Sequence, residues 1–129
     1  MTTEAEEQPR ELPDWPVFAF VTLDCRDPES LAEFWSEVME VEIEGHWGEY
    51  VMLARQPRRG VRLGLQKVPE PKQGKNRMHM DLMVRDLDAT KRKVLKLGGS
   101  LIEEHLDADY HWWVVADPEG NEFCIIAGV

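Results

Sequence analysis

After a polar N-terminal stretch, β-branched and aromatic residues alternate with smaller or polar ones over residues 17–24, and this pattern predicts a strand. Asp27 and Pro28 suit the start of a helix, because aspartate caps free backbone amides and proline fits the first turn. Apolar side chains then recur at helical spacing, at Leu31, Phe34, Trp35 and Val38. Shorter apolar runs predict three further strands, at 41–44, 50–55 and 61–68.

The second half of the chain repeats this order. Residues 78–84 alternate as a strand, and Asp86 precedes a helix with Leu87, Val94 and Leu97 on its inner face. Strands are predicted at 101–105, 111–116 and 122–127. The Arg-Asp pair that opens each helix recurs at an offset of 86 − 27 = 59 residues.

A repeat of half the chain predicts two copies of one βαβββ module, at 17–68 and 78–129, joined by a polar linker at 69–77. The offset makes Phe20 the counterpart of His79. The fold class expected is α+β, a strongly curved mixed sheet with the helices outside it.

Composition narrows the classes of function. The chain has 129 residues, which suits one domain, and a net charge of −10, which argues against nucleic acid and anionic membranes as partners. Two cysteines suggest a reducing compartment, and no apolar run reaches the ~18 residues of a spanning helix. Residues 1–16 are acidic and proline-rich, which predicts a flexible arm. Because this stretch is unlike a basic signal peptide, a cytoplasmic protein is expected.

The paired modules, the helix-opening Arg-Asp-Pro and Arg-Asp-Leu, and the segment Asp-Pro-Glu-Gly-Asn-Glu-Phe-Cys at 117–124 resemble the vicinal oxygen chelate superfamily. This group includes glyoxalase I, bleomycin-resistance proteins and extradiol dioxygenases, and the resemblance is nearest to its small glyoxalase-like domains. It covers residues 17–129 and implies a cup-like sheet. In metal-dependent members the first and last strands of each module supply imidazole and carboxylate ligands, which suit Zn, Ni, Mn or Fe.

The metal ligands implied by the resemblance match this sequence poorly. His79 falls on one ligand position, but Phe20 stands at its counterpart and Cys124 at the last-strand carboxylate position. Glu122 lies two residues earlier on the same strand face, so a metal, if present, would use His79 and Glu122. Strand 61–68 contains no Asp or Glu. We therefore predict no cofactor and a degenerate metal site, with a divalent metal as the open alternative.

Six residues are the predicted ligand contacts of the cup: Phe20, His79, Trp47, Tyr50, Trp113 and Cys124. Strand alternation must send Trp112 and Trp113 to opposite faces, and the sequence does not decide which of them faces the cup. The catalytic residues are unknown, with His79, Asp81 and Asp24 as candidates for acid/base roles. These residues can also have purely structural roles. His79 would then be a hydrogen-bonded histidine of the cleft, Asp24 and Asp81 would bind a backbone amide, and Cys124 would be a small apolar residue.

The leading functional prediction is a protein that binds a small organic molecule in an aromatic-lined cup. The alternative is a metal-dependent lyase, isomerase or dioxygenase of the same superfamily, and a third reading is a metal-free enzyme that uses Asp24, Asp81 or His79. A homodimer is expected, because related small members assemble in this way and exposed tryptophans favour an interface.

Overall fold

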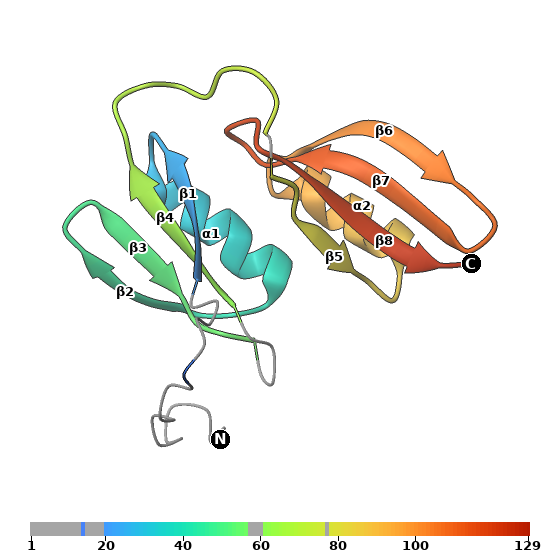
Figure 1. Cartoon of the computed structure of the whole chain (residues 1–129), viewed down its shortest axis with the longest axis horizontal. Coiled ribbons are helices and arrows are strands. Elements are labelled where there is room, and N and C mark those ends of the chain that lie inside the picture. The colour runs from blue at the N-terminus through green and yellow to red at the C-terminus, as the bar shows by residue number, and fades with distance from the viewer. Residues whose placement is uncertain (1–13, 15–19, 57–60, 77) are drawn as a thin grey trace.

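The computed structural model describes residues 14, 20–56, 61–76 and 78–129. The elements follow the order β1 (Phe20–Cys25), α1 (Pro28–Met39), β2 (Ile43–Trp47), β3 (Tyr50–Leu53), β4 (Arg62–Lys67), β5 (Asp81–Met83), α2 (Leu87–Lys96), β6 (Ser100–Leu106), β7 (Tyr110–Ala116) and β8 (Glu122–Gly128) (Figure 1). The predicted arm and the predicted start of the first strand at 17–19 lie outside the described residues, apart from Asp14.

Each module folds into its own four-stranded mixed sheet, with the strand order β1-β4-β3-β2 in the first and β5-β8-β7-β6 in the second. In both modules the first strand runs parallel to the last, and the other neighbours are antiparallel. This confirms the predicted α+β fold of two βαβββ modules. Within the described residues, β1 and β5 each pair with one strand only, so the mixed sheet is divided between the modules.

The strand registers establish which positions of the two modules correspond. Thr22 pairs with Gly64 in the first module, and Asp81 pairs with Cys124 in the second. Because Thr22 and Asp81 are separated by 81 − 22 = 59 residues, Gly64 is the structural counterpart of Cys124. The same relation makes Phe20 the counterpart of His79, as the repeat predicts.

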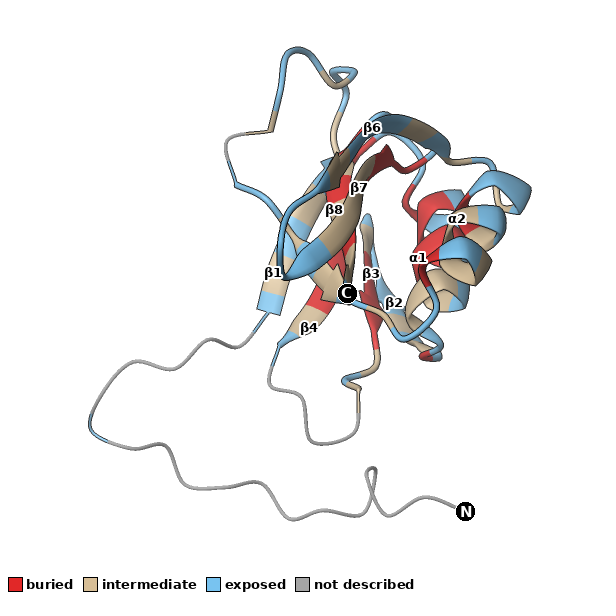
Figure 2. Ribbon diagram, turned by 90° about the vertical axis from the view of Figure 1, so that its right-hand side faces the viewer, coloured by how far each residue is buried: buried red, intermediate tan, exposed pale blue. Residues whose placement is uncertain are grey.

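Both helices lie on the same side of the two sheets (Figure 2). Each is capped as predicted: Asp27 Oδ1 accepts a hydrogen bond from the Ser30 amide at 3.2 Å, and Asp86 Oδ1 accepts one from the Ala89 amide at 3.0 Å. Neither helix is long and apolar enough to cross a membrane, as far as the described residues go.

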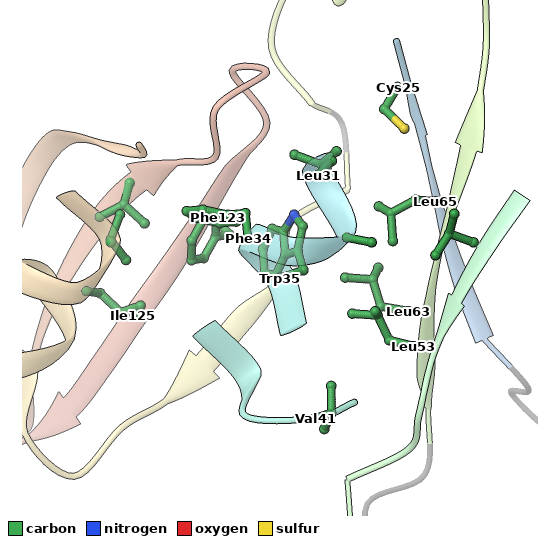
Figure 3. Close-up of a cluster of buried hydrophobic side chains, with 14 of the residues drawn as sticks. Cys25, Leu31, Phe34, Trp35, Val41, Leu53, Leu63, Leu65, Phe123 and Ile125 are labelled. Carbon is green, nitrogen blue, oxygen red and sulfur yellow. The ribbon is translucent and has the colours of Figure 1, made fainter. Parts of the chain in front are cut away.

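Helix α1 carries the core that the modules share. Figure 3 shows Trp35 between Leu53, Leu63 and Leu65 of the first sheet and Phe123 of the second. The ring centroids of Trp35 and Phe123 are 4.5 Å apart. Since neither module can bury enough apolar surface alone, this contact makes the two halves one folding unit.

The turn between β7 and β8 also joins the modules. Asp117 Oδ2 accepts a hydrogen bond from Trp35 Nε1 at 3.0 Å. The carboxylate of Glu119 accepts hydrogen bonds from the backbone amides of Arg26 and Asp27, at 2.9 and 3.0 Å, where the chain enters α1. The Asp-Pro-Glu-Gly turn at 117–120 therefore connects β7 with β8 and also anchors the first module.

A candidate ligand site between the two sheets

The face of the two sheets that points away from the helices, called the open face below, carries the candidate site residues. In β1 the side chains of Val21, Leu23 and Cys25 pack toward the helices, so alternation sends Phe20, Thr22 and Asp24 to the open face. In residues 79–83, which include β5, Met80 and Leu82 pack against the core. The same alternation therefore places His79, Asp81 and Met83 on the open face.

A hollow of about 450 Å³, the central hollow, lies between β1 and the segment that leads into β5. Its walls are mainly apolar, and its polar lining consists of Thr22, Asn76 and His79; the other lining residues are Val21, Leu23, Val61, Met78 and Met80. The hollow between the edge of β1 and residues 76–80 is large enough for a small molecule.

His79 also lines a smaller cavity of about 50 Å³, next to Glu122, Cys124 and Lys75. The structure thus brings His79, Glu122 and Cys124 together, as the shared strand face predicts. Burial raises the pKa of the Cys124 thiol to about 11, and the charge of Asp81 and a hydrogen bond with its carboxylate act in the same direction. The thiol of the metal-free protein is therefore protonated near pH 7, which makes it a poor nucleophile.

In the first module, Tyr50 fills the position that corresponds to Cys124. A Cβ atom added to Gly64 would lie 1.9 Å from the Tyr50 hydroxyl oxygen, so the phenol ring lies directly over this glycine. The Tyr50 hydroxyl forms a hydrogen bond with the Thr22 hydroxyl, with 2.8 Å between the oxygens. Sequence analysis could not place Gly64 at this position, because the register of β4 depends on pairing with β1 and β3.

These four positions do not fit a divalent metal. Phe20 and Gly64 offer no donor atom, and His79 and Cys124 offer one imidazole and one protonated thiol. Across the described residues, no group of three or more His, Cys, Asp or Glu side chains is placed to hold a metal ion. Transition metals in proteins are usually held by about three or four N, O or S ligands.

The aromatic residues of the outer strands divide between the two faces. Trp47 is opposite Tyr50 in the β2–β3 ladder, lies over Gly45 on the open face and is 60% exposed. In β7 it is Trp112, opposite Ile126 of β8, that shares this face, and its ring stacks on His105 with 5.0 Å between centroids.

The prediction that Trp113 faces the cup and contacts a ligand there is wrong, because its side chain lies on the helix side of the sheet. Val114 pairs with Cys124, so Val114 faces the open side and its neighbour Trp113 faces the helices. There the Lys91 ammonium lies 4.6 Å from the Trp113 ring centroid, and the ring packs against the core. Trp112 takes its place among the open-face aromatics.

Asp24 and His111 are not among the residues that line the central hollow. Asp24 lines an adjacent hollow of about 290 Å³ together with linker residues that include Lys72 and Gln73. Thr22, Leu23 and Asn76 line both hollows. His111 lies on the helix side, with its Nε2 2.7 Å from a Glu104 carboxylate oxygen. Among the described histidines, His79 is thus the one that lines the central hollow.

The family model of the glyoxalase-like domain matches residues 20–126, and this chain belongs to that family. No curated protein matches the sequence. Among solved structures, a glyoxalase/bleomycin resistance protein/dioxygenase family enzyme from Burkholderia phytofirmans has a TM-score of 0.69 at 15% identity, with 85% of this chain and 97% of that chain covered.

Two further structures have similar scores. A glyoxalase-related enzyme from Fulvimarina pelagi has a TM-score of 0.69 at 19% identity, covering 87% of both chains. A fosfomycin resistance protein from Mesorhizobium loti has a TM-score of 0.68 at 13% identity, covering 92% of this chain and 95% of that chain. At such identities the likeness establishes the fold, and the fold supports many different chemistries.

Proposed function

We propose that this protein binds a small organic molecule in the central hollow, on the open face of its two sheets. The observation that carries the proposal is the hollow itself: about 450 Å³, with apolar walls and a few convergent polar groups. Small-molecule sites are typically concave and apolar, about 300–1,000 Å³ in volume, with few polar groups that orient the ligand.

His79 is proposed as the main polar contact of this ligand. Its imidazole lines both the central hollow and the small cavity with Glu122, so it can hold a proton for, or accept one from, a bound molecule. Phe20 and Trp47 share this face and are 48% and 60% exposed. Neither of them lines the central hollow, so the predicted aromatic contacts are not part of its walls.

Binding of small aromatic compounds to 15N-labelled protein tests the proposal. We expect titration to shift the backbone amide signals of Val21, Leu23 and Met80, which line the hollow, while the signal of Glu104, on the far hairpin, stays in place. A set of neutral aromatic compounds that moves none of the three hollow signals at millimolar concentration would overturn the proposal.

The alternative is a metal-dependent lyase, isomerase or dioxygenase of the same superfamily. One observation favours it: His79 and Glu122, an imidazole and a carboxylate, line the same cavity. They supply two ligands, which is fewer than a tightly held transition metal generally requires.

Metal analysis separates the two functions. We expect protein purified without a polyhistidine tag and then dialysed to contain far less than one equivalent of zinc, nickel, manganese or iron per chain. A content near one equivalent that disappears in the His79→Ala variant would favour the enzyme over the binding protein.

A further inference from the structure

We propose that the Thr22 hydroxyl, positioned by Tyr50, selects the ligand by donating a hydrogen bond to an uncharged acceptor oxygen. The preferred ligands are then apolar molecules with a carbonyl or ether oxygen. This inference rests on the proposed function, because it names the chemistry of the molecule that occupies the central hollow.

The Thr22–Tyr50 pair has one hydroxyl proton to spare. Each hydroxyl carries a single proton, and the 2.8 Å contact between the two oxygens uses one of them. A phenol is a stronger donor than an aliphatic hydroxyl, so Tyr50 donates to Thr22 and the Thr22 proton remains available. A hydroxyl that accepts one hydrogen bond becomes a better donor in the next.

The position of Thr22 directs this proton to the ligand. Thr22 lines the central hollow from β1. Tyr50 belongs to β3, which is separated from β1 by β4, and is not among the residues that line the hollow. Tyr50 is held in place because Gly64 leaves room for its ring: an added Cβ would be 1.9 Å from the hydroxyl oxygen and 2.5 Å from the ring carbon that bears it. Tyr50 is thus a positioning residue and Thr22 the contact residue.

At the position that corresponds to Thr22, the second module has Asp81, a hydrogen-bond acceptor instead of a donor. There Asp81 pairs with Cys124 between β5 and β8, and its carboxylate can only accept hydrogen bonds. Asp81 and Glu122 outnumber the ammonium of Lys75 that lies beside them, and with the net charge of −10 they disfavour an anion on this face. An acceptor atom of the ligand is therefore bound by Thr22, beside the N–H donors of Asn76 and His79 that also line the hollow, and that atom is a neutral oxygen rather than a carboxylate.

Two probes of nearly equal shape test the inference: acetophenone and α-methylstyrene, in which a CH2 group replaces the carbonyl oxygen. Dissociation constants are measured from the shifts of the Val21 and Leu23 amides. We expect Thr22→Val, which keeps the side-chain shape, to weaken acetophenone binding by about 2- to 10-fold, the value of one neutral hydrogen bond, with α-methylstyrene binding unchanged.

Tyr50→Phe is expected to change the two affinities in the same selective way but by a smaller factor, because it removes the donor to Thr22 and keeps the ring over Gly64. Thr22→Ser should retain the wild-type ratio of affinities. Tyr110→Phe is the matched control, since Tyr110 belongs to β7 and is not part of the hollow.

Equal weakening of both probes by Thr22→Val, or no change for acetophenone, would overturn the inference and leave the proposed function intact. A Tyr50→Phe variant that matches the wild type would remove the positioning role of Tyr50. Failure of the wild type to bind either probe would count against the hollow as a ligand site, and hence against both proposals.

Discussion

Replacing Asp117 by alanine tests whether the β7–β8 turn joins the two modules. The Asp117 side chain is 3% exposed and accepts hydrogen bonds from Trp35 Nε1, from the backbone amides of Glu119 and Asn121, and from the Asn121 side chain. Trp35 and Asn121 are themselves buried, so their donors lose a partner that water cannot replace. Three buried donors are left unsatisfied: Trp35 Nε1 and the backbone and side-chain N–H groups of Asn121. With about 1–3 kcal/mol for each, the free energy of unfolding should fall by about 3–9 kcal/mol.

A double-mutant cycle isolates the contact that crosses between the modules. Trp35→Phe removes the indole N–H and part of the ring, and the cycle with Asp117→Ala cancels the cost of the lost volume. We expect a coupling free energy of about 1–2 kcal/mol, measured by urea unfolding followed by far-UV circular dichroism. The control cycle pairs Trp35→Phe with Glu119→Ala, which lies in the same turn but contacts the amides of Arg26 and Asp27.

The control cycle should give a coupling below about 0.5 kcal/mol, the usual deviation from additivity for residues that do not touch. A Trp35–Asp117 coupling as small as that of the control would refute the reasoning. The two modules would then be held together by their other contacts, such as the ring contact of Trp35 with Phe123 and the hydrogen bonds of Glu119 to the Arg26 and Asp27 amides.

Three further outcomes are expected. Burial raises the pKa of the Cys25 thiol to about 12 and that of Cys124 to about 11, so the native state keeps protons that unfolded thiols lose near pH 9. The stabilising contribution of the two thiols is thus fully present below about pH 9 and is lost as pH rises toward the two native pKa values. Between about pH 8.5 and 10.5, urea unfolding should therefore show a larger loss of stability for the wild type than for a variant with both cysteines replaced by alanine. His79→Ala should weaken acetophenone binding more than His46→Ala or His105→Ala, measured by the same amide shifts, and equal effects would remove the special role of His79. Light scattering at micromolar concentration should show a dimer of two 14.9 kDa chains, and a purely monomeric species would contradict that expectation.

The repeat was the strongest guide to the fold that the sequence contains. The offset of 59 residues predicts the paired modules and the correspondence of Phe20 with His79, and both agree with the registers of β1 with β4 and β5 with β8. The helix caps at Asp27 and Asp86 were equally predictable, because capping depends on residues within one turn. Local chemistry and periodicity therefore sufficed for the architecture.

The arrangement of the candidate site depends on contacts between residues far apart in the sequence, and for this reason the sequence predicts it only in part. Adjacent tryptophans in one strand must face opposite ways, yet only the pairing of Val114 with Cys124 shows that Trp113 faces the helices. The role of Gly64 was equally hidden, since it becomes evident only when Tyr50, on another strand, lies across it. The contact of Trp35 with Asp117 spans 82 residues and has no local signature.

Tyr50 and Gly64 occupy one volume, so their evolutionary histories are coupled. A carboxylate side chain acquired at position 64 would begin with a Cβ atom 1.9 Å from the Tyr50 hydroxyl, so Tyr50 would have to move or be replaced. Either change breaks the Thr22–Tyr50 hydrogen bond. A lineage that moved from this cup to a four-ligand metal centre would also have to replace Phe20. The arrangement therefore favours diversification of the bound molecule over gain of a metal.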